Sequence, residues 1–212
     1  MTRAIYLAPW RIDVTMRDGV KLPASIAGLS RMVAAALAAA GAPSPASIGL
    51  ILSDDAELTR LNTIHMGKNG PTDVLSFPLL PPASFPPHDG VRDRARATSD
   101  GFRLPPGRRQ HLGDIVISVQ RAVEQAAAGR GGQTGDVHWS AMDELRLLAV
   151  HGTLHICGWD HAEPAEEAAM RALEHRLLSP EVSSRRASRA VPSAAGPPGR
   201  DRALFGCLRR DS

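Results

Sequence analysis

The stretch from His151 to His161 constrains this chain more than any other part of it. It reads His-Gly-Thr-Leu-His-Ile-Cys-Gly-Trp-Asp-His. On an α-helix, His151 and His155 are separated by about 400° of rotation and about 6 Å of rise, so both imidazoles leave the same face. Gly158 can take the left-handed conformation that ends a helix, and the reversed chain can then return His161 to the same point. Three imidazoles with a fourth position open are typical of a catalytic zinc site, so we predict a metal centre here.

One residue of this stretch departs from the zinc peptidases. Gly158 occupies the place of the glycine in their pattern H-E-x-x-H-x-x-G-x-x-H. Gly152, however, stands where those enzymes carry the glutamate that acts as general base. Peptide hydrolysis through that glutamate is therefore excluded, whereas a metal could still lower the pKa of a bound water and polarise a substrate oxygen.

Hydrophobic periodicity predicts an α+β domain, in which helices pack on a small mixed β-sheet. The residues from Leu145 to Val150 are almost all apolar, which predicts a buried, zincin-like metal-binding helix that carries His151 and His155. We expect strands at residues 4–7, 12–15, 46–52, 74–77 and 114–119. We expect helices at residues 25–40, 55–65, 121–128, 136–157 and 164–178.

Residues 1–180 are expected to form one domain, with a long loop rich in Pro and Arg inserted at residues 79–110. The segment 129–135 reads as a flexible link, and residues 181–212 read as a disordered tail. The tail carries seven Arg against three acidic residues, a net charge of +4, whereas the first 180 residues carry 18 basic against 19 acidic groups. The basic loop and the basic tail could contact an RNA backbone or could simply be solvated.

The rest of the sequence indicates which disulfides, which location and which cofactors to expect. Two cysteines, Cys157 and Cys207, do not make a disulfide framework. The first residues contain no long apolar run, so we expect no signal peptide, no membrane partner and a cytoplasmic location. The chain has neither a Walker-type loop nor a G-x-G-x-x-G loop, so we expect no nucleotide cofactor.

Three stretches together resemble one family, the YbeY endoribonucleases of ribosomal RNA maturation. The stretch from His151 to His161 is similar to the family signature H-G-x-L-H-L-x-G-Y-D-H. Residues 71–78, Pro-Thr-Asp-Val-Leu-Ser-Phe-Pro, resemble its P-T-[DN]-V-L-S-F-P strand, and residues 112–117, Leu-Gly-Asp-Ile-Val-Ile, resemble its L-G-D-[IL]-x-I strand. The likeness covers roughly residues 45–178, with the Arg-rich insertion as the interruption.

The resemblance implies a metal-dependent endoribonuclease that is specific for single-stranded RNA. It implies a role in maturing the 3′ end of 16S rRNA and in ribosome quality control. It also implies one Zn²⁺, or another divalent ion, held by His151, His155 and His161. The implied partners are small-subunit rRNA, the ribosome and ribosomal proteins in the cytoplasm.

One position departs from the family pattern. Members usually carry an Arg in the turn R-G-K-[DN], where this chain has Met66 before Gly67 and Lys68. A guanidinium suited to a phosphate or to a developing phosphorane charge is therefore missing there. We expect Lys68, or an Arg of the loop 89–110, to take its place; reduced activity is the alternative.

The catalytic candidates are thus His151 and Lys68. Asp160 and Asp114 are candidates for orienting an imidazole from behind, although a helix-end cap and a strand-edge turn residue are equally good interpretations. Two other functions remain open: another zinc-dependent hydrolase, and a non-catalytic ribosome assembly factor with a structural metal. The methionine at position 66 favours the second of these.

Overall fold

A computed structural model describes residues 1–88, 108–129 and 139–179 of the chain. The strands are β1 (Thr2–Leu7), β2 (Trp10–Met16), β3 (Ala46–Ser53), β4 (Val74–Pro78) and β5 (Gln110–Ser118). The α-helices are α1 (Ile26–Ala39), α2 (Asp55–Leu61), α3 (Val119–Ala127), α4 (Ala141–Ile156) and α5 (Pro164–Leu178). A π-helical turn, η1 (Asn62–Met66), follows α2, and a 3-10 turn, η2 (Pro82–Ser84), follows β4. The predicted α+β class is confirmed.

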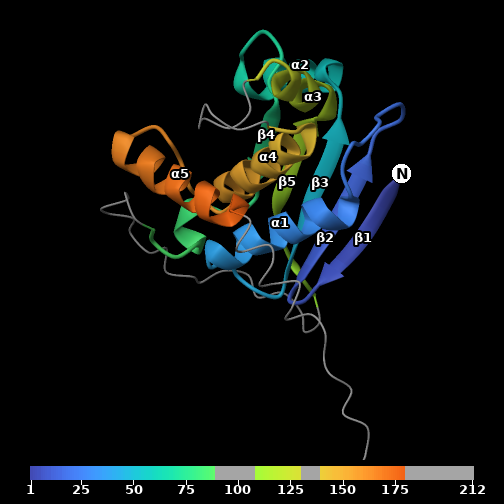
Figure 1. Ribbon diagram of the computed structural model, residues 1–212. Coiled ribbons are helices and arrows are strands. Elements are labelled where there is room, and N and C mark those ends of the chain that lie inside the picture. The colour runs from blue at the N-terminus through green and yellow to red at the C-terminus, as the bar shows by residue number, and fades with distance from the viewer. Residues whose placement is uncertain (89–107, 130–138, 180–212) are drawn as a thin grey trace, which may run out of the picture.

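The sheet is mixed and has the strand order β1-β2-β3-β5-β4. The central strands β2, β3 and β5 run parallel, and the edge strands β1 and β4 pair with them antiparallel. Figure 1 shows α1 and α4 lying across one face of this sheet, with α5 beside α4. A strand-to-strand connection that returns in the same direction needs a crossover, and α1 provides it between β2 and β3.

The main core lies between that face of the sheet and the helices α1, α4 and α5. Ile115 and Ile117 of β5 point into it, together with alternate residues of β3 and buried leucines of α4. Val116, which lies between those two isoleucines, points to the opposite face and packs with Leu58 of α2 in a smaller cluster. Side-chain alternation along β5 therefore divides its residues between the face of the sheet that carries α4 and the face that carries α2.

Several predicted boundaries shift. The helix expected from residue 136 begins only at Ala141, because Ser140 and Asp143 form a capping box there. The helix expected over residues 55–65 changes to π-helical geometry after Leu61. Most of the expected loop 79–110, nearly all of the expected link 129–135 and the tail 181–212 lie outside the described residues. Within the described part, every helix is too short or too polar to cross a bilayer.

Helix α4 approaches the sheet most closely at Gly152. A Cβ atom built on this glycine would lie 2.7 Å from Cγ2 of Ile115 and 3.2 Å from Oγ of Ser76. The Ser76 hydroxyl also donates a hydrogen bond to the Gly152 carbonyl, at 3.1 Å. Position 152 therefore faces the sheet and has no room for a side chain. This is the physical reason why the glutamate of the zinc peptidases has no counterpart here.

The substitution Gly152→Ala is expected to lower the free energy of unfolding by about 1–3 kcal/mol, because the added methyl group overpacks the contact between α4 and β5. Urea unfolding followed by circular dichroism measures this change.

Gly28→Ala in α1 serves as the matched control. A Cβ built on Gly28 meets only the Cβ of Ser25, at an ordinary 3.6 Å. Since alanine favours the helix by about 0.5–1 kcal/mol over glycine, this variant should be as stable as the parent or more so. Equal destabilisation by both variants would contradict the close approach at Gly152.

Candidate metal centre

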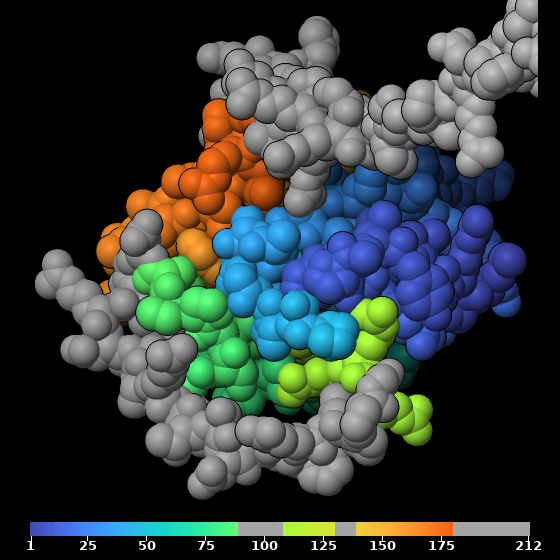
Figure 2. All heavy atoms as spheres, turned by 90° about the horizontal axis from the view of Figure 1, so that it is seen from below, coloured from blue at the N-terminus to red at the C-terminus, as the bar shows by residue number. Residues whose placement is uncertain are grey.

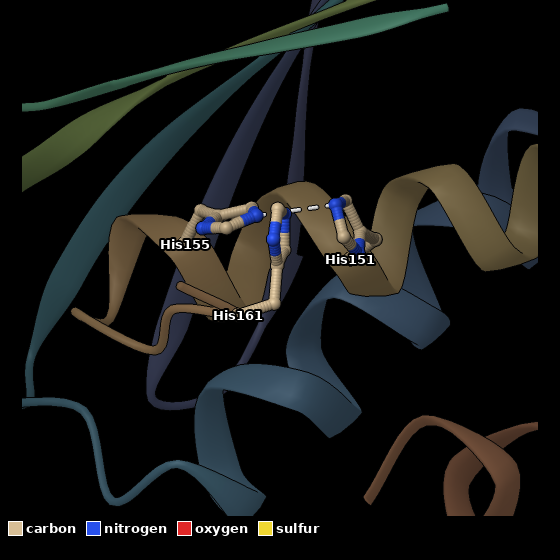
Figure 3. Close-up of side chains that lie close together, drawn as sticks. All are labelled: His151, His155 and His161. Carbon is tan, nitrogen blue, oxygen red and sulfur yellow. Dashed lines mark hydrogen bonds between the residues drawn. The ribbon is translucent and has the colours of Figure 1, made fainter. Parts of the chain in front are cut away.

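Helix α4 and the turn that follows it bring three imidazoles together. One ring nitrogen from each of His151, His155 and His161 lies within 4.8 Å of the other two. Figure 3 shows His151 and His155 leaving the same side of α4, and His161 reaching back between them from the loop. His151 and His155 are half-buried, and His161 is exposed. The cluster that the spacing predicted could thus bind a metal ion, and the role of each ligand stays a prediction.

The turn after α4 depends on Gly158, as the sequence indicates. This glycine has a φ of 80°, in the left-handed region. Its backbone N–H donates to the carbonyl of His155 at 3.0 Å, and the N–H of Trp159 donates to the carbonyl of Leu154 at 3.0 Å. These bonds close the end of α4 and reverse the chain, which returns His161 to the helix.

The outer nitrogens of the two helical histidines have fixed partners. Nδ1 of His151 lies 2.8 Å from Oε1 of Glu174 in α5, and Nδ1 of His155 lies 2.9 Å from the backbone carbonyl oxygen of Trp159. A carboxylate and a carbonyl oxygen can only accept, so each neutral imidazole carries its proton on Nδ1 and donates it to that partner. A lone pair is therefore left on each Nε2.

These two lone pairs face each other, which supplies a test of whether a metal fits. The Nε2 atoms of His151 and His155 lie 3.1 Å apart (Figure 3), although neither neutral ring has a proton to share at that position. A tetrahedral zinc ion with Zn–N distances of about 2.0–2.1 Å places two ligand nitrogens about 3.3 Å apart. The separation and the imidazole donors thus fit zinc or a similar ion, and three ligands leave one position open.

The environment of His155 favours the form that binds a metal. Burial lowers its pKa from the usual 6.5 to about 4, and the neighbouring rings of His151 and His161 act in the same direction. The carbonyl of Trp159 and the carboxylate of Asp160 oppose this shift. His155 is therefore neutral at neutral pH, as a metal ligand must be.

The predicted orienting residues have other partners. The Asp160 carboxylate accepts a hydrogen bond from the backbone N–H of His161, at 2.8 Å. Asp114 alternates along β5 with Ile115, which touches α4, so its side chain leaves the opposite face of the sheet. There its carboxylate lies 3.2 Å from Nε2 of His111. The structure does not bring Asp114 to the three histidines.

Lys68 follows the π-helical turn and is exposed. Its backbone N–H donates to the carbonyl of Asn62 at 3.4 Å, and Met66 is exposed beside it. The catalytic role expected of Lys68 stays a prediction.

Glu174 is the site residue that the sequence analysis missed. Its side chain is only 12% exposed, and it lies four residues after Met170 and three before Leu177, both of which are buried. Glu174 therefore lies on the apolar face of α5, and an acid in such a position is the signal that the sequence offers. The carbonyl of Trp159 has no such signal, because every residue has a carbonyl.

Replacing Glu174 tests the assignment of the protons. Glu174→Ala should weaken zinc binding about 10–100-fold, since His151 loses the group that fixes the orientation and the tautomer of its ring. Competition with a chromophoric chelator measures the affinity. Glu167→Ala, which removes an acid that pairs with Arg171 on the same helix, should leave the affinity unchanged. Equal effects of the two variants would contradict the role of Glu174.

The low pKa of His155 predicts a pH dependence of the metal-free protein. The unfolded chain binds a proton at His155 below about pH 6.5, whereas the folded chain resists it until about pH 4. The free energy of unfolding should therefore fall as the pH decreases through this window, and this contribution should be constant outside it. Urea unfolding in the presence of a chelator measures the slope. His155→Gln should show a smaller slope, and an identical slope would contradict the shift.

Comparison with known proteins places this site in a family. The family model described as endoribonuclease YbeY matches residues 15–180. An endoribonuclease YbeY from Roseiflexus sp. (strain RS-1) is 40% identical over 136 residues, which are 63% of this chain and 69% of the relative. An endoribonuclease YbeY from Chloroflexus aurantiacus is 35% identical over 171 residues, 80% of this chain and 94% of the relative.

A solution structure of a Thermotoga maritima protein aligns with 89% of this chain and 99% of its own, at 18% identity and a TM-score of 0.44. That likeness is too low to carry an assignment. The family model spans most of the described residues, and the histidine signature lies within its match. The chain therefore belongs to the endoribonuclease YbeY family.

Proposed function

We propose that this protein is a metal-dependent endoribonuclease that hydrolyses single-stranded RNA. Its place would be the cytoplasm, in the maturation of the 3′ end of 16S rRNA and in ribosome quality control, with the ribosome and ribosomal proteins as partners. One observation carries the proposal: in a member of an endoribonuclease family, the Nε2 atoms of His151 and His155 lie 3.1 Å apart with a third imidazole beside them.

His151, His155 and His161 would hold the ion, and zinc is the ion that three imidazoles with an open position suit best. When bound, such an ion supplies a water of lowered pKa and a positive charge beside a phosphate. The protein keeps the ligands ready for it. Glu174 and the carbonyl of Trp159 hold the protons at Nδ1, so that the Nε2 atoms remain acceptors.

The proton acceptor for the attacking group cannot come from position 152, where the sheet leaves no space. Either a water or the ribose 2′-OH could then attack the phosphorus, and the second route leaves a cyclic phosphate. Lys68 is proposed to contact the phosphate in place of the guanidinium that Met66 lacks.

A non-catalytic assembly factor with a structural metal is the second candidate. The methionine at position 66 favours it, because a charge that would stabilise the transition state is absent there. A zinc peptidase is disfavoured by the closed position 152.

The decisive experiment incubates the zinc-loaded protein with single-stranded RNA and, separately, with casein. We expect cleavage of the RNA alone, loss of cleavage with a chelator, and recovery on adding Zn²⁺. His151→Ala should abolish cleavage yet still sediment with ribosomes, and Lys68→Ala should slow it on the order of 10²-fold. His175→Ala, which removes a histidine of α5 outside the cluster, is the control with full activity.

Cleavage of casein alone would establish the alternative hydrolase. A wild-type protein that binds zinc and ribosomes but leaves RNA intact would establish the assembly factor. Mass analysis of the RNA ends distinguishes a cyclic phosphate from a product of direct hydrolysis.

A further inference from the structure

The segment 79–88, between β4 and the first gap in the described residues, lies against the corner where α1 and α4 end. Phe85 is buried in the main core. Pro86 lies against the turn after α1, where its Cγ is 2.9 Å from a Cβ built on Gly41. Figure 2 shows this segment, in green, beside the light-blue residues that follow α1 and the orange residues of the last two helices, α4 and α5. Phe85 and Pro86 thus anchor the segment before it reaches the loop from Gly158 to His161, which is called the metal loop below.

His88, at the end of this segment, contacts the metal loop at two consecutive residues. Its ring stacks on the indole of Trp159, with centroids 3.9 Å apart and planes only 9° from parallel. Its Nε2 also lies 3.4 Å from the carbonyl oxygen of Gly158. Few side chains could meet both groups, because a parallel stack requires a flat ring and the second contact requires a nitrogen at its edge.

The loop that His88 contacts performs two tasks in the metal centre. The carbonyl of Trp159 accepts a hydrogen bond from Nδ1–H of His155, at 2.9 Å. Two residues later the same loop carries His161, the exposed third imidazole. Asp160 and His161 are both exposed, so burial in the core does not hold these two residues in place. The loop is held before them, by the backbone bonds at the end of α4, by the packing of Trp159 against the main core and by the contacts of His88.

We propose that His88 is a positioning residue of the metal centre. By stacking on Trp159 it holds the peptide that orients His155 and sets the point from which His161 returns to α4. Its loss should weaken metal binding without removing any ligand. The inference rests on the proposed metal site, and it is independent of whether RNA is cleaved.

The test compares zinc affinities of the full-length wild type, His88→Ala and His88→Phe, measured by competition with a chromophoric chelator. The phenylalanine keeps the flat ring and loses the edge nitrogen. His65→Ala is the matched control, because it also removes a histidine ring from an aromatic contact, here edge-on with Phe77 at 5.2 Å. The wild type is measured first: if it does not bind zinc, the metal site itself is refuted, and otherwise the variants test only His88.

We expect His88→Ala to weaken zinc binding about 10-fold, at the low end for groups that orient a ligand indirectly. His88→Phe should restore the affinity to within about 3-fold of the wild type, since the stack is the main contact. His65→Ala should bind as the wild type does. In the cobalt-substituted protein, His88→Ala should also change the visible d–d absorption, because a displaced His161 alters the coordination geometry; general loss of stability would leave that spectrum unchanged.

Wild-type affinity and an unchanged cobalt spectrum in His88→Ala would overturn the proposal. So would a His88→Phe variant as weak as His88→Ala, since the stack would then contribute nothing. If His88→Ala fails to fold, His88→Phe carries the test alone: near-wild-type affinity supports the stack, and a 10-fold loss overturns it.

Discussion

The metal centre depends on where two protons are held. Glu174 and the carbonyl of Trp159 each accept a hydrogen bond from the outer nitrogen of one imidazole, which keeps the proton of the neutral ring there and leaves the inner nitrogens of His151 and His155 as facing acceptors. Two facing acceptors repel each other, and a cation held between them would relieve that repulsion, so the arrangement suits a metal-binding role. The spacing of four residues places the rings of His151 and His155 on one side of α4. Glu174 and the carbonyl of Trp159 then determine that the Nε2 atoms face each other.

Two neighbouring faces of α4 have different chemical possibilities. At Gly152 the backbone of α4 lies against Ile115 and Ser76, so the position that provides the base in zinc peptidases is closed by packing alone. The face one step around the helix, with His151 and His155, remains open towards the loop. A glycine that looks like a missing catalytic group is therefore the residue that allows the metal helix to lie on the sheet.

The parts of this site that sequence reasoning predicted are those fixed by local periodicity. The offset between His151 and His155 and the left-handed turn at Gly158 are properties of one helix and its end, so they could be predicted from adjacent residues. The predicted start of α4 at residue 136 was wrong, because the hydrogen bonds between Ser140 and Asp143 begin the helix at Ala141 instead. The role of Asp114 stayed open between orienting an imidazole and ending a strand, because a motif does not state which sheet face a strand residue takes. The contacts from Glu174 and His88 join segments 23 and 70 residues apart, beyond any local pattern.

The position of Glu174 on α5 has a consequence for biosynthesis. A ribosome makes the three histidines before it makes the last helix of the domain, so the nascent chain can gather the imidazoles while His151 still lacks its carboxylate partner. Emergence of α5 from the exit tunnel then completes the cluster. The carboxylate that fixes the ring of His151 is thus the last part of the histidine cluster to be translated.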